Sequence, residues 1–591
     1  MDHKKIQTIF NQYKTNENVV MIFMAMIVGI LGGYGAVAFR WLISFFQLLF
    51  FRFEGGNFLQ YALSLPWYAR LIPPVIGGMI VGPLVYFFAR EAKGHGVPEV
   101  MEAVALKGGV IRKRIVLIKT FASSITIASG GSVGREGPIV HIGSAIGSAF
   151  GQILAVSVDR MRTLVACGAA AGIAATFNAP IAGVMFAMEI ILGDFGIMIF
   201  SPIVVSSVMA TIISRAYLGN NPAFSVPSYT MVSISEIPLY MLLGIVAGLA
   251  GVLFTATLYK MEDLFDNLKI PAYTKAAVGG LIIGMIGIFL PHIFGVGYNA
   301  IDLALTDKLP WVILLALIFM KITATSLTIG SGGSGGIFAP SLFIGAMTGG
   351  AFGYLAHILF PSSTATAGAY SLVGMGAVVA ATTHGPITAI LILFEMSGNY
   401  RIILPLMLSC IISSVFASHL KKESIYTLKL IRRGVNIHEG REVNIMKSLN
   451  VGESMTRTVE TVPEDMSLKE LIRYTMGSKH SSFPVVDKNG LLTGILTFQD
   501  IKEIIYEECL DGIIVKDLAI TKVITVTDQD NLDMALKKIG FKNIEQLPVV
   551  DKNNPGKIIG ILSRRDIFAA YNKALIDRSL ADETSKDSKD C

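Results

Sequence analysis

Long apolar runs fill the first two thirds of the chain, from about residue 19 to residue 420, and charged residues are confined to short breaks between them. A helix that crosses a bilayer needs about 20 apolar residues, so these runs predict membrane helices. The run at 164–192 is broken in its middle by Asn178-Ala179-Pro180, which predicts two half-length segments. The run at 71–88 is interrupted by paired prolines and paired glycines, and the other predicted spans are 19–51 (long enough to be tilted), 115–128, 139–155, 198–217, 238–259, 276–288 and 311–328.

Two glycine-rich breaks, at residues 130–138 and 330–340, share one architecture and indicate an internal repeat. Phe150-Gly151 matches Phe352-Gly353 at an offset of 202 residues, and the break at 178–180 followed by Glu189 matches 384–386 followed by Glu395 at an offset of 206. Broken helices in corresponding positions are typical of transporters with two inverted repeats and a binding site between half-helix ends. We therefore predict an all-α, polytopic membrane domain at 19–434, with repeats at about 19–218 and 236–420.

The first break carries an acidic residue where chemistry favours an anion. Gly134-Arg135-Glu136-Gly137-Pro138 reads as a loop that leads into a helix N-terminus. The free N–H groups and the positive dipole end of a helix attract anions there. Glu136 is itself an anion in that position, so this loop is the candidate functional centre.

The chain becomes polar after Lys421 and is duplicated again. Segments around 483–500 and 547–566 share a Pro-Val-Val-Asp run, a Gly-Ile-Leu strand and a terminal aspartate, which predicts two small α/β units; a pair of them could bury a shared core. We divide the remaining chain into an N-terminal segment at 1–18, a linker at 435–450, two α/β units at 451–510 and 515–575, and a disordered tail at 579–591.

Composition supports a membrane protein, with 52% hydrophobic and only 16% charged residues. The net charge of +6 comes from basic clusters that flank apolar runs, so they indicate cytoplasmic loops rather than a nucleic-acid site, although simple solvation of loops explains any one of them equally well. Four cysteines without paired spacing predict neither a disulfide framework nor a zinc site.

These motifs resemble the CLC family of chloride channels and chloride/proton exchangers, over about residues 19–434. The resemblance implies that Glu136 is the gate, because its carboxylate can occupy an anion site until chloride or a proton displaces it. It implies anion contacts from the backbone of the glycine-rich segments and from one tyrosine; in this sequence the predicted anion-site residues are His95, Gly96, Arg135, Gly137, Ile337, Phe338 and Tyr426. Glu395 to Tyr400 gives a further match.

Two departures from the family pattern bear on mechanism. His95 stands where the family has an anion-coordinating serine; its ring N–H could contact the anion, or the ring could point away and leave the amides of Gly94 and Gly96 to bind it. Coupled exchangers carry two adjacent glutamates after the Asn-Ala-Pro break, and here Glu189 is followed by Ile190, which cannot hold a proton. Glu189 could instead be a structural cap. The sequence therefore favours passive or weakly coupled chloride conduction, with tight chloride/proton exchange as the alternative.

The tail resembles a pair of CBS domains, and this implies a regulatory role in the cytoplasm. An adenine nucleotide (ATP, ADP or AMP) would contact Thr497, Asp500, Ser563, Arg564 and Asp566, or the pair would bind nothing and serve as a dimer contact. The family implies a homodimer in the cell membrane with the N-terminus in the cytoplasm. A CBS-regulated cation transporter is disfavoured because intramembrane acids are few. No metal-ligand or nucleophile spacing points to an enzyme. We expect no required cofactor and no nucleic-acid partner.

Overall fold

The computed structural model describes residues 17–89, 93–220, 224, 226–227, 229–435, 446, 449–478, 480–504, 512–542 and 544–574. The chain divides into two compact units, residues 1–437 and 438–591, and each is described by itself. Residues 1–16, most of the predicted linker and the tail beyond 579 lie outside the described residues.

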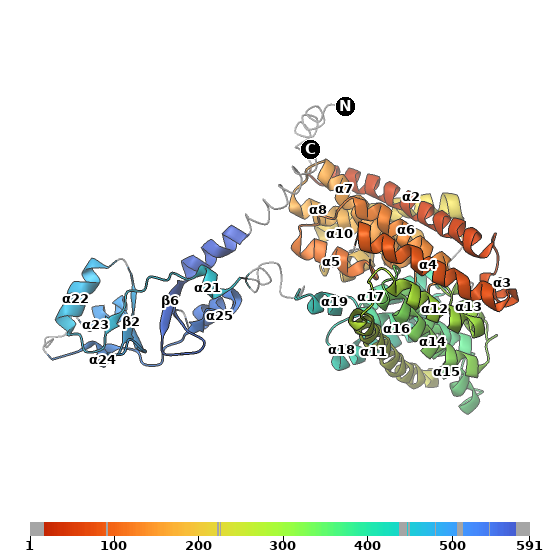
Figure 1. The fold of residues 1–591 in the computed structure, drawn as a ribbon. Coiled ribbons are helices and arrows are strands. Elements are labelled where there is room, and N and C mark those ends of the chain that lie inside the picture. The colour runs from red at the N-terminus through yellow and green to blue at the C-terminus, as the bar shows by residue number, and fades with distance from the viewer. Residues whose placement is uncertain are drawn as a thin grey trace. The chain divides into compact units, whose positions relative to one another are not determined.

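The first unit is helical throughout (Figure 1). Its first half contains α2 (Glu17–Phe51), α3 (Phe58–Ser64), α4 (Trp67–Phe88), α5 (Val97–Leu106), α6 (Arg114–Ala128), α7 (Glu136–Ile153), α8 (Val158–Phe177), α9 (Pro180–Phe186), the π-helical η2 (Ala187–Leu192) and α10 (Ile197–Leu218). Its second half contains η3 (Ile234–Glu236), α11 (Ile237–Asn267), α12 (Lys275–Phe289), η4 (Pro291–Ile293), α13 (Tyr298–Leu305), α14 (Trp311–Gly330), α15 (Phe338–Leu359), α16 (Ala367–Thr383), α17 (Pro386–Ser397), η5 (Tyr400–Ile402), α18 (Ile403–Leu420) and α19 (Thr427–Arg432).

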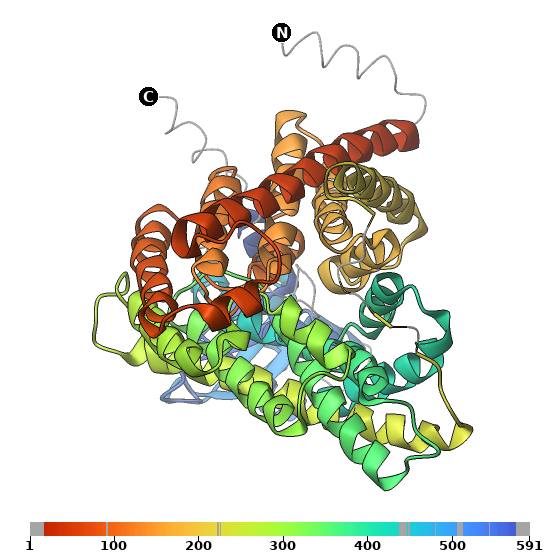
Figure 2. The ribbon, with the colours of Figure 1, turned by 90° about the vertical axis from the view of Figure 1, so that its right-hand side faces the viewer.

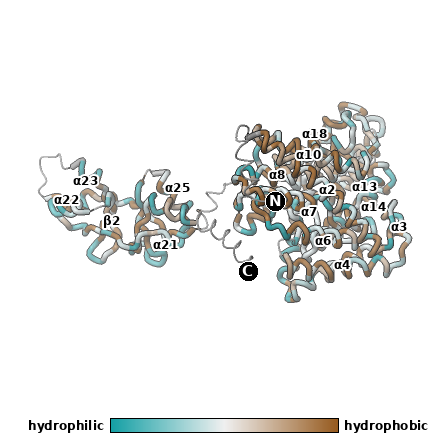
Figure 3. Tube along the Cα trace, turned by 90° about the horizontal axis from the view of Figure 1, so that it is seen from above, coloured by the Kyte–Doolittle hydropathy of each residue, from teal (hydrophilic) through white to brown (hydrophobic). Residues whose placement is uncertain are grey.

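Within the described residues, seven helices are long and apolar enough to cross a membrane. Figure 3 shows apolar stretches along these helices, whereas the second unit is more polar. The expectation of a polytopic, largely helical membrane domain is confirmed. Most of the predicted spans lie within a helix whose observed bounds extend a few residues further, whereas the span predicted at 139–155 runs two residues beyond the end of α7.

Two details of the prediction are wrong. α4 continues through its paired prolines and glycines. The glycines allow close packing on α12: a Cβ added at Gly78 would lie 2.3 Å from the carbonyl oxygen of Ala276, and one at Gly280 would lie 2.1 Å from that of Pro74. In addition, α8 has 20 residues and is not half-length; only the segment after the Asn178 break is short, because Asn178 ends α8 in a left-handed conformation.

The two halves lie side by side (Figures 1 and 2). Reciprocal hydrogen bonds between equivalent residues indicate that an approximate two-fold axis relates them. The amide of Ser132 donates to the Thr328 hydroxyl at 3.1 Å, and the amide of Ser334 donates to the Thr126 hydroxyl at 3.4 Å. Both pairs of equivalent residues differ by the same offset of 202 that the sequence shows. The glycine-rich segments therefore meet at the axis.

The second unit contains two copies of one small α/β arrangement. Each has a three-stranded sheet in which the first strand is parallel to the second and the third is antiparallel to it. Within the described residues each copy has its own apolar core, rather than the shared core that the sequence suggested. The elements are α21 (Val451–Ser454), β1 (Val462–Pro463), α22 (Leu468–Gly477), β2 (Ser482–Val486), β3 (Leu492–Thr497) and α23 (Phe498–Ile504), then α24 (Val515–Leu518), β4 (Val526–Thr527), α25 (Leu532–Lys542), β5 (Gln546–Val550) and β6 (Ile558–Ser563).

Candidate functional site

Two helix N-termini meet at the centre of the first unit. α7 begins at Glu136 and α15 begins at Phe338, and both ends are buried. The loops before them are joined by a two-way backbone bridge, in which Gly134 N donates to Gly336 O at 2.7 Å and Gly336 N donates to Gly134 O at 2.6 Å. The bridge holds the two helix N-termini close together, and buried helix N-termini are a suitable environment for an anion.

The Glu136 side chain lies in this region and is 1% exposed. Its Oε2 accepts a hydrogen bond from the amide of Ala339, in the first turn of α15, at 3.3 Å. Its Oε1 accepts a hydrogen bond from the Tyr298 hydroxyl at 2.7 Å. The carboxylate therefore takes the place at the α15 N-terminus that a free anion would take.

His95, whose carbonyl lies against the first turn of α7, has its ring next to that of Tyr426. Their ring centroids are 5.7 Å apart, and both side chains are buried. Nδ1 of His95 is buried and has no hydrogen-bond partner in the described part of the chain. The Tyr259 hydroxyl donates to the carbonyl of Ile425 at 2.6 Å, which fixes the backbone that carries Tyr426. An unpaired polar atom here is suited to an anion or a water molecule.

The Gly94–Gly96 loop is held tightly beside α7. Gly96 adopts a left-handed conformation (φ 85°) and ends the loop at the start of α5. The buried ammonium of Lys119 donates to the carbonyl of Gly94 at 2.7 Å. A Cβ added at Gly137 would lie 2.3 Å from the carbonyl oxygen of His95, so the first turn of α7 and this loop touch through their backbones.

Several of the sequence-predicted residues therefore lie close together. Glu136 contacts the first turn of α15, and Gly137 packs against the backbone of His95, whose ring lies near that of Tyr426. Arg135 turns to Tyr298, with its guanidinium carbon 5.0 Å from the ring centroid.

The predicted proton-path residues lie elsewhere. Glu189 is in η2, and its two oxygens accept hydrogen bonds from Ile387 N at 3.1 Å and from the Thr388 amide and hydroxyl at 2.7 Å. It therefore caps the N-terminus of α17. Glu395 does the same for α9, through the amides of Ile181 at 3.0 Å and Ala182 at 2.7 Å.

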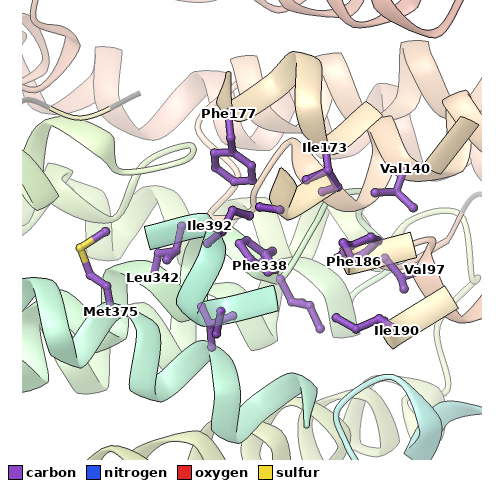
Figure 4. Packing of buried hydrophobic residues seen from close by; sticks show 14 of the residues in the cluster. Val97, Val140, Ile173, Phe177, Phe186, Ile190, Phe338, Leu342, Met375 and Ile392 are labelled. Atoms are coloured by element: carbon purple, nitrogen blue, oxygen red, sulfur yellow. The ribbon is translucent and has the colours of Figure 1, made fainter. Parts of the chain in front are cut away.

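Ile190 is apolar, 6% exposed, and packs beside Val97 and Phe186 (Figure 4). In the described structure, the position that follows Glu189 is thus part of the hydrophobic core. No group there can hold a proton.

Sequence reasoning missed Tyr298 and two buried lysines. Lys119 and Lys321 differ by 202 positions, so the repeat offset could have paired them. Lys321 donates to the carbonyls of Ile293 at 3.1 Å and Gly295 at 3.0 Å, as Lys119 does to Gly94. The signal for Tyr298 was a second Gly-x-Gly sequence just before it, at Gly295 to Gly297.

In the tail, the predicted nucleotide residues form two equivalent turns. Asp500 accepts hydrogen bonds from the Thr497 amide at 2.8 Å and its hydroxyl at 2.7 Å. Asp566 accepts the same two from Ser563, at 2.9 and 2.7 Å. The Arg564 amide donates to the Glu545 carbonyl at 3.2 Å. These residues are not among those that line a cavity of about 640 Å³ in the tail: Asn450, Gly452, Glu453, Met455, Arg457, Asp528, Gln529 and Ile559.

Comparisons with known proteins agree with this arrangement. Residues 77–418 match the family described as voltage gated chloride channel (Voltage_CLC), and residues 450–507 and 515–573 each match the CBS domain. The chain is 37% identical over 416 residues to a putative chloride channel protein, ClcB-like, of Ralstonia nicotianae, a match that covers 70% of this chain and 97% of that protein. It is 34% identical over 442 residues to the H⁺/Cl⁻ exchange transporter ClcA of Vibrio cholerae, covering 73% and 93%.

Among solved structures, the crystal structure of a slow cyanobacterial Cl⁻/H⁺ antiporter is similar, with a TM-score of 0.64 and 30% sequence identity over 70% of this chain and 97% of that chain. The family match spans more than half of the present chain. With two buried helix N-termini around a carboxylate and a duplicated α/β tail, the protein belongs to the CLC family of anion transport proteins and carries a pair of CBS domains.

Proposed function

We propose that the protein exchanges chloride for protons across the membrane, and that Glu136 serves as both the gate for the anion and the carrier of the proton. The observation that supports this is the position of the Glu136 carboxylate, which accepts a hydrogen bond from the amide of Ala339 at the N-terminus of α15. A carboxylate and a chloride compete for the same donors, so binding of one requires that the other leave.

Protonation of Glu136 is a second way to displace its side chain from the N-terminus of α15. A neutral carboxylic acid is attracted less by amide donors and by the positive end of a helix than a carboxylate is. A proton on Glu136 therefore favours chloride in the site, and chloride in the site leaves Glu136 free to take or give a proton. Alternation between these two occupants couples the two fluxes.

The relatives favour exchange over the passive conduction that the sequence alone favoured. Both the Vibrio cholerae transporter and the cyanobacterial structure carry names that describe exchange of chloride and protons. Passive chloride conduction is the second candidate, and one observation favours it: Ile190 places an apolar side chain where the coupled exchangers of the family carry the second glutamate.

A liposome assay that reads both ions decides between them. Purified protein is reconstituted with a chloride gradient, and external chloride and pH are recorded together. Exchange predicts uphill proton movement at a fixed ratio to chloride flux, and passive conduction predicts chloride flux without it. Glu136→Gln should abolish proton movement while chloride flux continues; loss of chloride flux in wild type would contradict both candidates.

For the anion site we propose that His95 and Tyr426 form one side and that the amides of Gly137, Ile337 and Phe338, with Gly96 and Arg135 nearby, form the other. The unpartnered Nδ1 of His95 supports a direct contact. His95→Ser should change the ratio of chloride flux to nitrate or fluoride flux. Unchanged flux ratios would remove His95 from the site and leave the loop amides as the ligands.

We also propose that the tail lies in the cytoplasm, that the CBS pair binds an adenine nucleotide, and that the protein is a homodimer. Family membership supports the dimer, and light scattering of the purified protein in detergent tests it. The paired turns of Thr497–Asp500 and Ser563–Asp566 support the nucleotide site, since each leaves one carboxylate oxygen outside the turn.

A further inference from the structure

A second glycine-bounded loop, Gly295 to Gly297, lies next to Glu136. Gly297 adopts a left-handed conformation (φ 88°) and precedes α13, whose first residue is Tyr298. Only glycine fits there without strain, because a Cβ at Gly297 would also lie 2.7 Å from the Phe343 ring. The loop therefore sets the direction in which the Tyr298 side chain leaves the backbone.

A buried lysine holds this loop in place. Lys321 donates to the carbonyls of Ile293 and Gly295, and its ammonium lies 4.9 Å from the centroid of the Phe343 ring. Lys119 holds the Gly94–Gly96 loop in the same way from the other repeat. The two loops are thus equivalent parts of the duplicated scaffold. One presents His95 toward Tyr426, and the other presents Tyr298 toward Glu136.

The contact between Tyr298 and Glu136 is well fixed. The hydroxyl donates to Oε1 at 2.7 Å, which is a short bond to a carboxylate. The Tyr298 ring is held on one side by Phe224, with ring centroids 4.7 Å apart, and on another by the Arg135 guanidinium. A ring held in this way offers its hydroxyl in one direction.

We propose that Tyr298 is a positioning residue for the Glu136 gate, and that its hydroxyl holds the carboxylate in the anion site and so sets the proton and chloride concentrations at which the gate opens. The inference rests on the proposed function, since it assigns a control on the same gate. A hydrogen bond donated to a carboxylate favours its charged form. It therefore favours ionised Glu136 in the anion site over protonated Glu136 displaced from it.

Other charged and titratable groups act on the same carboxylate or on its tyrosine partner. Arg135 precedes Glu136 in the chain, and Lys321 of α14 and Tyr426 before α19 interact with it electrostatically without a hydrogen bond to it among the described residues. Arg40 of α2 acts on Arg135 and on Tyr298. All of these groups stay in place when only the Tyr298 hydroxyl is removed, so Tyr298→Phe isolates the one hydrogen bond.

The test compares wild type with Y298F in chloride flux from liposomes across a range of pH. A lost hydrogen bond to a charged group corresponds to about one pH unit, or ~1.4 kcal/mol. We expect the midpoint of the flux–pH profile to move about one unit toward alkaline pH. Chloride affinity measured by calorimetry in detergent should rise about tenfold, because Glu136 competes less well for the site.

Controls separate this effect from a structural one. Y61F removes a peripheral hydroxyl that donates to the Phe51 carbonyl at 2.8 Å, and it should leave the profile unchanged. In a Glu136→Gln background, Y298F should change neither flux nor chloride affinity. A profile and affinity equal to wild type, or an equal change in the E136Q background, would overturn the proposal.

Two further variants keep the test decisive if Y298F folds poorly. Tyr298→His keeps a ring donor and Tyr298→Leu has none, so the first should lie nearer to wild type in chloride affinity; the reverse order would contradict the proposal. Calorimetry does not depend on transport. Absence of chloride flux in wild type would therefore count against the proposed function, whereas equal chloride affinities would count against the role of Tyr298.

Discussion

Replacement of Lys429 by methionine should destabilise the membrane unit strongly, because it removes the main partner of a buried carboxylate. Lys429 in α19 and Glu99 in α5 form an ion pair with a nitrogen–oxygen distance of 2.8 Å, and their side chains are only 7% and 9% exposed. α19 follows Tyr426 directly, so this pair fixes the helix next to the candidate anion site to the helix that follows the His95 loop.

The size of the effect follows from burial. Loss of one partner of a buried pair costs about 3–5 kcal/mol, since it leaves an uncompensated charge. Arg433 also reaches Glu99, at 3.4 Å, but its side chain is 46% exposed and it cannot replace the lost contact fully. We therefore expect a cost of about 3 kcal/mol, at the lower end of that range. Chloride affinity should fall as well, because Tyr426 loses support.

The assay is unfolding of the purified full chain in detergent, followed by fluorescence, with chloride affinity measured on the same preparations. The matched control is Lys93→Met. Lys93 pairs with Asp266 at a similar distance, 3.1 Å, but the side chains are 34% and 57% exposed. An exposed pair contributes about 0–1 kcal/mol, so K93M should unfold close to wild type.

The double variant E99Q/K429M sharpens the argument. It removes both charges, so most of the stability lost in K429M should return. If K429M unfolds no more easily than K93M, or if the double variant is as unstable as K429M, the loss does not arise from a stranded charge and the reasoning is wrong.

Further predictions address the site and the tail. Gly137→Ala should abolish chloride binding and reduce the monodisperse fraction in gel filtration, because its Cβ would lie 2.3 Å from the His95 carbonyl oxygen. Glu189→Gln and Glu395→Gln should each lower the free energy of unfolding by about 1 kcal/mol. The two effects should be similar, because each carboxylate caps a helix of the other repeat. Asp566→Ala should abolish the stabilisation of the full chain by ATP in thermal unfolding; a lower unfolding temperature with an unchanged ATP effect would assign it a capping role alone.

The central geometry could be predicted because the repeat offset is visible in the sequence. Gly134 and Gly336 are 202 positions apart, and in the structure they form the bridge that brings the two helix N-termini together. Equivalent residues of two repeats related by a two-fold axis meet at that axis, so a constant offset predicts contacts as well as similarity. The positions of the predicted spans followed from apolar length, but α15, α16, α17 and α18 were not among those predicted.

Contacts away from the axis were not predictable in this way. The hydrogen bond from Tyr298 to Glu136 joins residues 162 positions apart, and its direction depends on how α13 packs and on the left-handed Gly297. Paired prolines predicted a break in α4, but bilayer helices tolerate proline when neighbouring groups satisfy the freed backbone. Local sequence rules carry no information on such neighbours.

The duplicated scaffold alone gives no direction to transport, since a strictly two-fold arrangement presents the same groups to both sides of the membrane. Direction has to come from positions where the repeats differ. At the offset of 202, Glu136 at the start of α7 corresponds to Phe338 at the start of α15, so only one helix N-terminus carries an acid. Tyr298, the first residue of α13, corresponds to Val97, the first residue of α5, at an offset of 201, so only one of these two loops offers that acid a hydroxyl. The hydroxyl of Tyr298 donates to Glu136, so both differences fall at one place, and the proposed gate would act there.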